Sequence, residues 1–221
     1  MQVYFCELSD VWDVTVVERC LSVISVEKRD RICRMRSMMD KKLTLFADIL
    51  IRLLACRAYG VKNCELSFSA NTYAKPALEG YPEFHFNISH THNAITVAVN
   101  DAPVGIDVEQ IRQEPVGIAE RFFTQQEQRY IYQSENDKEM RFFEVWTKKE
   151  AYVKYTGRGL SLPMNTFCVI DKNSASKLLH SFYHNNYVVS VCSDELCRDA
   201  IELIHLTETD ISRALYELHF A

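Results

Sequence analysis

The sequence lacks the long apolar run of a membrane protein, because no stretch approaches the roughly 20 consecutive apolar residues that a membrane-spanning helix needs. The first residues, MQVYFCELSD, contain neither a basic segment nor a long apolar one and therefore predict no secretory signal. Positive charge is not in excess: 30 Asp and Glu residues outnumber 25 Lys and Arg residues, for a net charge of -5 at pH 7. This balance argues against a nucleic-acid-binding protein. We therefore expect a cytoplasmic protein with no membrane partner and no nucleic-acid partner.

The chain also lacks the cysteine spacings of metal-binding and redox sites, since none of its eight cysteines forms a CxxC or CxxH pair. An even number of cysteines is compatible with disulfides, but a long chain without a predicted signal favours buried, reduced thiols. Most of them lie in apolar stretches such as LLACRAYG and VVSVCS. The eight are Cys6, Cys20, Cys33, Cys56, Cys64, Cys168, Cys192 and Cys197.

Glycine and proline are scarce, with six and five residues, and no low-complexity segment or obvious linker interrupts the 221 residues. An apolar content of 48% and a charged content of 25% are typical of a chain that forms one large domain or two small ones. Apolar residues recur at helical spacing in residues 43–60, LTLFADILIRLLACRAYG, and in residues 143–157, FEVWTKKEAYVKYTG. Both stretches end at a glycine, Gly60 or Gly157, as helices commonly do.

Strand-like segments follow each predicted helix. EFHFNIS and NAITVAVN follow the first helix, and NTFCVI and NNYVVSVCS follow the second. We therefore predict an α+β fold, resembling an α/β sandwich, built from two similar subdomains of about 100 residues, each a helix packed on a small antiparallel sheet. The predicted halves are residues 1–104 and residues 105–221, which meet near residues 103–110.

Period-two alternation indicates two half-buried strands. In EFHFNIS, the apolar residues at positions 84, 86 and 88 share one face, and the polar residues at positions 85, 87 and 89 share the other. In APVGIDVEQI, the apolar residues at positions 104, 106 and 108 alternate with Gly105, Asp107 and Glu109. Each strand thus places its polar residues on one face.

Asp107 and Glu109 are two residues apart on that face, so their Cβ atoms are separated by about 6–7 Å. Both side chains can then reach one hard cation, which prefers oxygen ligands. Gly105 shares the face without a side chain and leaves room for a bulky ligand. The alternative, which is the more common one for an isolated DxE sequence, is a polar strand face in contact with water.

Glu150 is a single carboxylate among the lysines of the second predicted helix, Lys148, Lys149 and Lys154. If Glu150 points toward the strand, three carboxylates meet, and without a cation at least one of them takes up a proton. Mg²⁺ removes this conflict, because it is held by a few carboxylates together with substrate phosphates, which lysine also binds. Lys154 follows four residues later on the same helical face. The alternative is an ordinary Glu–Lys pair on a surface helix.

Basic residues are concentrated between Glu27 and Lys42, where seven of them stand against three acidic residues. This local excess of positive charge indicates an anion site, although a solvated amphipathic helix gives the same pattern. Ser89 and His90 end a predicted strand and begin a loop, where polar side chains commonly meet ligands. The basic residues are Lys28, Arg29, Arg31, Arg34, Arg36, Lys41 and Lys42.

Taken together, these segments resemble the 4′-phosphopantetheinyl transferases, specifically the longer, monomeric type that activates surfactin synthetase. The order of segments matches: a basic stretch with TLFADILIR, then AKPAL, FNISH, VGIDVE, FFTQQE, and WTKKEAYVK followed by GRGLSLP. The resemblance covers residues 28–193, and its most specific part is the pair GIDVE and WTKKEAYVK. It implies a holo-[carrier protein] synthase type transferase, whose two pseudo-twofold-related halves enclose the active site in the cleft between them.

The resemblance also implies the roles of individual residues. Mg²⁺, for which Mn²⁺ is a possible substitute, is expected on Asp107, Glu109 and Glu150. The pyrophosphate of coenzyme A is expected on Lys149 and Lys154, and the loop beside its adenine contains Lys75 and Pro76. The 3′-phosphate and neighbouring groups are expected on Lys28, Arg31, Thr44, Ser89 and His90. The implied catalytic residues are Asp107, Glu109, Glu150 and Lys154. Ala74 stands where the family commonly has a glycine.

The implied reaction moves the phosphopantetheine arm of coenzyme A to a serine of an apo acyl or peptidyl carrier protein and releases 3′,5′-ADP. Such a transfer asks the protein mainly for positioning and charge neutralisation. The base that accepts the serine proton is open between Glu150, a water on the metal and Glu127. Residues 115–123, PVGIAERFF, either contribute apolar contacts to the carrier or pack in the core.

Two alternatives use the same residues. A Mg²⁺-dependent pyrophosphate hydrolase acting on coenzyme A-like substrates releases free phosphopantetheine and needs no carrier. A non-catalytic module binds coenzyme A or the carrier without transfer, but the presence of the four implied catalytic residues argues against it. The mass of the carrier after incubation distinguishes these alternatives.

Overall fold

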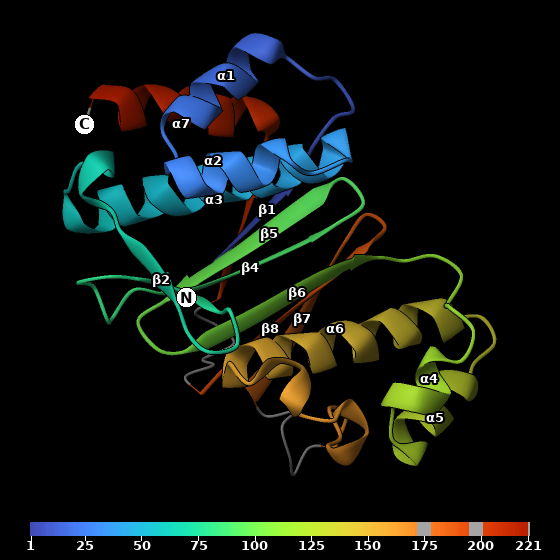
Figure 1. Cartoon of the computed structure of the whole chain (residues 1–221). Coiled ribbons are helices and arrows are strands. Elements are labelled where there is room, and N and C mark those ends of the chain that lie inside the picture. The colour runs from blue at the N-terminus through green and yellow to red at the C-terminus, as the bar shows by residue number, and fades with distance from the viewer. Residues whose placement is uncertain (172–177, 195–200, 221) are drawn as a thin grey trace.

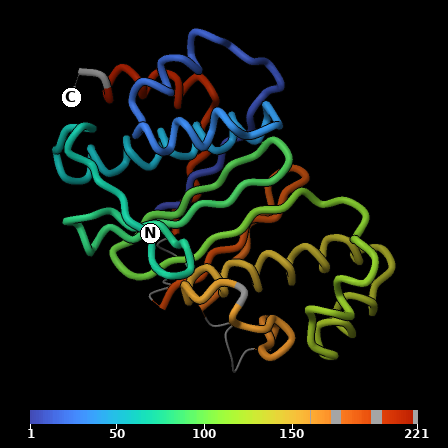
Figure 2. The backbone as a smooth tube through the Cα atoms, in the orientation of Figure 1, coloured from blue at the N-terminus to red at the C-terminus, as the bar shows by residue number. Residues whose placement is uncertain are grey.

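The computed structural model describes residues 1–171, 178–194 and 201–220, and these residues fold into four layers (Figure 1; Figure 2). Two β-sheets pack face to face in the middle, and helices cover the outer face of each sheet. The core between the sheets contains Val3 and Phe5 from one side and Val189 and Val191 from the other. The predicted α+β, sandwich-like fold is confirmed. In the described ranges, no helix is long and apolar enough to cross a membrane.

The first sheet has the strand order β4-β5-β1-β9. Its strands are β1 (Gln2–Glu7), β4 (His85–Thr91), β5 (Ala94–Asn100) and β9 (Glu202–Leu206). The long helix α3 covers its outer face, and three further helices pack around α3. These helices are α1 (Val14–Ser22), α2 (Val26–Cys33), α3 (Met38–Tyr59) and α7 (Glu208–Phe220). A short ribbon after α3 consists of β2 (Phe68–Ala70) and β3 (Pro76–Leu78).

The second sheet has the strand order β6-β8-β7. Its strands are β6 (Val104–Gln110), β7 (Leu179–His184) and β8 (Tyr187–Ser193). The helix α6 covers its outer face, with two short helices beside it (Figure 1). These helices are α4 (Ile118–Phe122), α5 (Gln125–Tyr132) and α6 (Lys138–Thr156).

The two halves share one topology, as the order of predicted elements suggested. In the first half β1 is followed by α3 and by the β4–β5 hairpin, and β5 pairs with β1. In the second half β6 is followed by α6 and by the β7–β8 hairpin, and β8 pairs with β6. All these pairings are antiparallel. The end of the chain differs, because β9 pairs in parallel with β1 and α7 packs against α3, so both return to the first sheet.

The two long helices end where the sequence predicts and begin earlier. Gly60 and Gly157 follow α3 and α6 with φ angles of 65° each, a left-handed conformation that glycine adopts readily. The helix α3 begins at Met38, where the side chain of Ser37 accepts a hydrogen bond from the backbone N–H of Asp40. The added residues, 38–42 of α3 and 138–142 of α6, mix charged and apolar residues, so apolar periodicity alone does not mark these starts.

Two strand predictions need correction. NTFCVI forms no strand, and the first strand of the second hairpin is β7. The prediction of half-buried strands is wrong for β6, in which the residues from Val104 to Val108 are all buried because α6 covers its polar face. A strand buried on both faces can still alternate polar and apolar residues when the polar ones serve a site.

The buried cysteines fit the predicted reduced thiols. Cys6, Cys20, Cys56 and Cys192 are buried, whereas Cys33 and Cys64 are exposed. Burial raises the pKa of Cys6 and of Cys20 to about 12, which keeps these thiols protonated and unreactive. Cys197 lies outside the described residues.

Candidate active site

The site is built where β4 of the first sheet lies beside β6 of the second. The side-chain oxygen of Asn87 accepts a hydrogen bond from the backbone N–H of Ile106 at 2.9 Å. Ser89 donates to Asp107 Oδ1 at 2.7 Å, and Thr91 donates to Glu109 Oε2 at 2.8 Å. Polar residues two apart on one strand therefore meet polar residues two apart on the other. The two halves are joined along this seam by side chains, because the two strands belong to different sheets.

The helix α6 brings a cation and a third carboxylate to this seam. Lys154 Nζ lies 2.7 Å from Asp107 Oδ1 and 2.9 Å from Ser89 Oγ. Glu150 is one helical turn earlier and lines the same cavity as Lys154. The helix comes this close because position 105 has no side chain: a Cβ there would lie 2.1 Å from the carbonyl oxygen of Ala151. The expectation that Gly105 leaves room for a ligand is therefore wrong, since α6 itself fills that space.

Burial, and after it the neighbouring negative charge, raises the pKa values of two of the carboxylates. Burial, followed by the charge of Asp107, raises the pKa of Glu150 to about 7, against the opposing effect of Lys154. Burial also raises the pKa of Glu109, although the hydrogen bond from Thr91 opposes this shift. Asp107 is nearly buried and its Oδ2 atom has no hydrogen-bond partner. A buried carboxylate oxygen without a partner is costly and calls for a ligand.

The donor set fits a hard divalent cation in its chemistry, since it offers carboxylate oxygens and the unpaired Oδ2 of Asp107. The Lys154 ammonium binds the other oxygen of Asp107 and holds that side chain in place. Among the described residues, no three Asp, Glu, His or Cys side chains are grouped as a ready-made metal site. The structure therefore supplies suitable ligands around the seam without gathering them.

A cavity of about 340 Å³ opens at the seam and contains Glu150 and Lys154 in its lining. One wall is the segment from Tyr73 to Pro76, which precedes and begins β3. Lys75 Nζ donates to the carbonyl oxygens of Val104 at 2.9 Å and of Lys154 at 2.7 Å, so its ammonium fastens this wall to β6 and to the end of α6. The loop that we expected beside the adenine thus lines the cavity, while the ammonium of Lys75 is used within the protein.

Ala74 adopts a φ of 63° in this wall. Residues with a Cβ pay about 1–2 kcal/mol for such a left-handed conformation, and glycine does not. We expect Ala74→Gly to stabilise the folded protein by about 0.5–1 kcal/mol. The gain is smaller than the strain that is removed, because glycine also has more conformational freedom in the unfolded chain. Urea unfolding measures this change; Ala77→Gly, in the strand β3, should instead destabilise, and a loss of stability in both would contradict the prediction.

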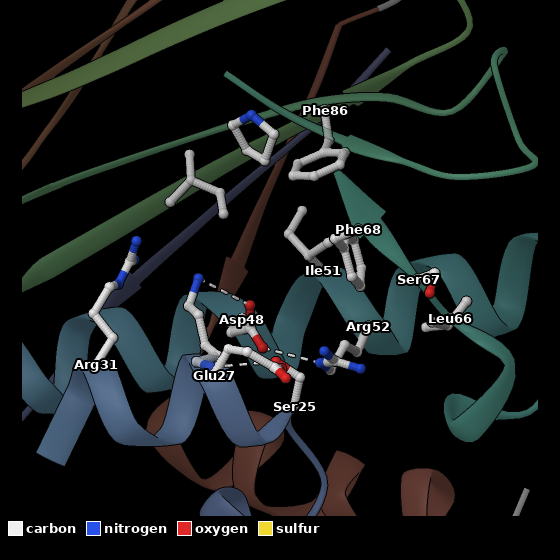
Figure 3. A pocket seen from close by; sticks show the side chains of 13 residues that line it. Ser25, Glu27, Arg31, Asp48, Ile51, Arg52, Leu66, Ser67, Phe68 and Phe86 are labelled. Carbon is white, nitrogen blue, oxygen red and sulfur yellow. Dashed lines mark hydrogen bonds and ion pairs between the residues drawn. The ribbon is translucent and has the colours of Figure 1, made fainter. Parts of the chain in front are cut away.

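A second cavity of about 390 Å³ adjoins the first, because Pro76 and Ile88 line both. Its walls include the apolar side chains of Ile51, Phe68 and Phe86 (Figure 3). Lys28 and Arg31 of α2 line it as well. The structure therefore places part of the predicted anion site on one cavity and the predicted carboxylate site on its neighbour.

Of the predicted contacts of the 3′-phosphate, Thr44 and His90 are not among the residues that line either of these two cavities. Thr44 is on α3, with its hydroxyl 3.8 Å from Met35 Sδ. His90 is inside β4, which continues to Thr91, so the expectation that a loop begins at Ser89 and His90 is wrong. Burial and the charge of Lys154 lower the pKa of His90, so the imidazole lies within electrostatic range of the seam.

Lys149 and Glu127 are enclosed in the protein and not open to a ligand. Both side chains are 0% exposed, and Lys149 Nζ lies 2.8 Å from Glu127 Oε2. Lys149 also donates to the carbonyl oxygens of Met164 and Phe167, each at 2.7 Å. Glu127 accepts from the backbone N–H groups of Thr124 and Val169. Neither the expected pyrophosphate contact of Lys149 nor a role of Glu127 as base fits these enclosed positions. They connect α5, α6 and the following segment.

We expect Lys149→Met to lower the free energy of unfolding by about 3 kcal/mol, because it leaves the Glu127 carboxylate buried without its cation. The KM for the phosphate-bearing substrate should stay unchanged in the folded fraction. Thermal unfolding with substrate kinetics measures both quantities. A raised KM with normal stability would return Lys149 to the site.

Sequence reasoning missed Asn87 and Thr91 as contacts across the seam, and Asp48 as a carboxylate that lines the second cavity. Period-two spacing placed Asn87 on the face of Ser89, and the same spacing, extended by two residues, would have included Thr91. No comparable signal existed for Asp48, since it is a single carboxylate inside an apolar helical run.

Comparisons with known proteins describe one family across both halves. A family model described as the 4′-phosphopantetheinyl transferase superfamily matches residues 103–200, and one described as 4′-phosphopantetheinyl transferase, N-terminal, matches residues 12–102. The border between the two matches falls immediately before β6, where the second copy of the topology begins.

Curated relatives carry the same description. The chain is 37% identical to a 4′-phosphopantetheinyl transferase of Bacillus subtilis over 69% of this chain and 68% of the relative. It is 36% identical to the transferase Sfp of Bacillus subtilis (strain 168) over 69% and 68%. It is 33% identical to the transferase gsp of Aneurinibacillus migulanus over 81% of this chain and 75% of the relative.

Proposed function

Since the chain belongs to the 4′-phosphopantetheinyl transferase superfamily, and is an enzyme that transfers the phosphopantetheinyl group, we propose that the seam between β4 and β6 is where it does so. Coenzyme A is the donor in this family, and a carrier protein is the acceptor. The observation that carries the proposal is the contact of Lys154 with Asp107 and Ser89 beside Glu150, which joins both halves of the chain.

We place the pyrophosphate of coenzyme A at Lys154 and Ser89, in the cavity that Glu150 lines. The adjoining cavity receives the adenosine end, with its 3′-phosphate at Lys28 and Arg31 and with Pro76 in the wall common to both cavities. Thr44 and His90, which line neither cavity, are proposed contacts of the groups beside this phosphate on the family resemblance alone. Two cationic places, one in each adjoining cavity, suit a ligand that carries phosphates at separate points.

Asp107, Glu109 and Glu150 are the residues that would hold Mg²⁺ or Mn²⁺. The ion would neutralise charge on the pyrophosphate and on the departing 3′,5′-ADP. Lys154 supplies a further positive charge at the same place and is itself positioned by Asp107 and Ser89. Glu150, which lines the cavity beside Lys154, or a water held next to it, is the group that we place to accept the proton of the carrier serine.

The predicted carrier-docking segment divides between surface and core. Val116 is 99% exposed, whereas Ala119 and Phe123 are buried with α6. We place the acyl or peptidyl carrier against the exposed part. Residues of both halves come from one chain, which supports a monomer, and the substrates support a cytoplasmic enzyme.

The test is the intact mass of apo carrier proteins after incubation with the enzyme, coenzyme A and Mg²⁺. We expect a gain of about 340 Da, the mass of the phosphopantetheinyl group. Loss of coenzyme A without a mass gain would favour the hydrolase alternative. Survival of coenzyme A with every carrier of a fatty-acid, polyketide and peptide panel would favour a binding module.

We also expect the stabilisation by Mg²⁺ to depend on pH. The pKa of Glu150 is raised to about 7, so below that pH the carboxylate holds a proton that a cation must displace. The increase in melting temperature on adding Mg²⁺ should therefore be large at pH 7.5 and small at pH 5.5. The same increase at both pH values would argue against Glu150 as a ligand.

A further inference from the structure

Asp48 binds two cations that reach it from different helices. Its Oδ1 atom lies 3.2 Å from Lys28 Nζ of α2, and its Oδ2 atom lies 2.9 Å from Arg52 Nε, one turn later on α3. All three residues line the larger cavity, and Figure 3 shows the carboxylate of Asp48 next to Arg52. Each carboxylate oxygen thus serves one cation.

Arg52 is committed to the protein and is not available to a ligand. Its side chain is 6% exposed, its Nη1 donates to Asn63 Oδ1 at 3.0 Å, and its guanidinium lies 5.1 Å from the ring centre of Phe68. It therefore balances the charge of Asp48 permanently. Lys28, with a side chain 28% exposed, is the more open of the two cations.

The charge of Lys28 is consequently held in place without being cancelled. One carboxylate with two cations leaves a net charge of +1, and Arg31, on the same cavity, adds another. The opposing charge on the same rim is Glu27, which is exposed. A free lysine side chain loses up to about 2 kcal/mol of rotamer entropy when a ligand orders it. A lysine already held by Asp48 has lost part of it beforehand.

We propose that Asp48, neutralised from behind by Arg52, is a positioning residue that presents Lys28 to the 3′-phosphate of coenzyme A. This inference rests on the proposed placement of that phosphate at Lys28. It assigns to Asp48 a role in selecting donors that carry the phosphate over donors that lack it.

The sign of the effect separates positioning from bulk charge. Asp48→Asn removes a negative charge from the cavity, which by charge alone would improve the binding of an anionic donor. If Asp48 positions Lys28, the KM for coenzyme A rises instead, by about tenfold, as expected for the loss of a well-placed charged hydrogen bond. The KM for 3′-dephospho-coenzyme A should change by less than about twofold, since that donor has no phosphate for Lys28 to bind. Glu27→Gln is the matched control: it removes a charge from the same rim, and the KM for coenzyme A should stay equal or fall.

Steady-state transfer to one apo carrier is measured with both donors on the same enzyme preparation. The donor ratio is kcat/KM for coenzyme A divided by kcat/KM for 3′-dephospho-coenzyme A, and a loss of folded enzyme cancels in it. Asp48→Asn in a Lys28→Gln background should leave the donor ratio of Lys28→Gln unchanged. If Asp48→Asn does not fold, Asp48→Glu displaces Lys28 with the charge retained and should lower the same ratio. An equal loss with both donors, or a fall in KM like that of Glu27→Gln, would overturn the positioning role. If Lys28→Gln affects both donors equally, the placement of the 3′-phosphate is wrong. If the unaltered enzyme transfers nothing to any carrier, the proposed function is wrong.

Discussion

Replacing Glu150 by glutamine is expected to lower the rate of carrier modification by about 10²–10³-fold, the usual cost of removing one charged group that stabilises a reaction centre. The substitution keeps the shape of the side chain and removes its charge. Glu150 lines the cavity beside Lys154, and burial together with the charges of Asp107 and Glu109 raises its pKa. Both the binding of a cation and the acceptance of a proton need the carboxylate.

The same substitution should not destabilise the metal-free protein. Burial and the neighbouring carboxylates raise the pKa of Glu150 to about 7, so above that pH the folded state holds a charge that it disfavours. Below the ordinary pKa the wild-type group is protonated in both states, and the cost is absent. Glutamine avoids this cost, and we expect the variant at pH 8 to be equally or more stable, by about 1 kcal/mol.

Intact-mass measurement of carrier modification gives the rate, and chemical denaturation gives the stability. Glu139→Gln is the matched control, because it makes the same change in the first turn of α6. Normal transfer by Glu150→Gln would exclude Glu150 from the reaction. Slow transfer together with a large loss of stability would show that the carboxylate is structural.

The sequence predicted the carboxylate face and both helix ends because these follow from local periodicity. Asp107 and Glu109 share a face by the geometry of any strand, and a glycine ends each long helix. What periodicity cannot show is which strand lies beside which. The contact between β4 and β6 joins two sheets through the side chains of Asn87, Ser89 and Thr91. No turn or pairing pattern in the sequence predicts this contact.

The lysines show the same limit at the level of single residues. Lys149 and Lys154 are both near Glu150 in the sequence, but on a helix they point in different directions. Lys154 reaches Asp107 at the seam, while Lys149 is enclosed with Glu127. The motif around Lys75 predicts a contact with the ligand, but its ammonium instead donates hydrogen bonds to carbonyl oxygens at the end of α6. A charged residue can act on a ligand only where the fold leaves its charged group open to the cavity.

Gly105 should be the position where a small change has the largest effect on stability. A Cβ built there would lie 2.1 Å from the carbonyl oxygen of Ala151 and 2.3 Å from the backbone nitrogen of Tyr155. These are backbone atoms, so no rotation of a side chain relieves the overlap, and α6 must move away from β6. We expect Gly105→Val to lower the free energy of unfolding by about 4 kcal/mol or more, beyond the usual cost of overpacking.

Any Gly105→Val protein that folds should also lose transfer activity, because Glu150 and Lys154 move with α6 while Asp107 stays on β6. Denaturant unfolding and carrier modification test the two parts separately. Gly60→Ala is the control: a Cβ there meets nothing within 4 Å and only the φ of 65° is unfavourable, so it should cost about 1 kcal/mol and leave the rate unchanged. Equal stability losses in the two variants would contradict the close contact. A stable and active Gly105→Val enzyme would contradict the prediction, because it would mean that α6 and β6 can lie further apart without loss of the site.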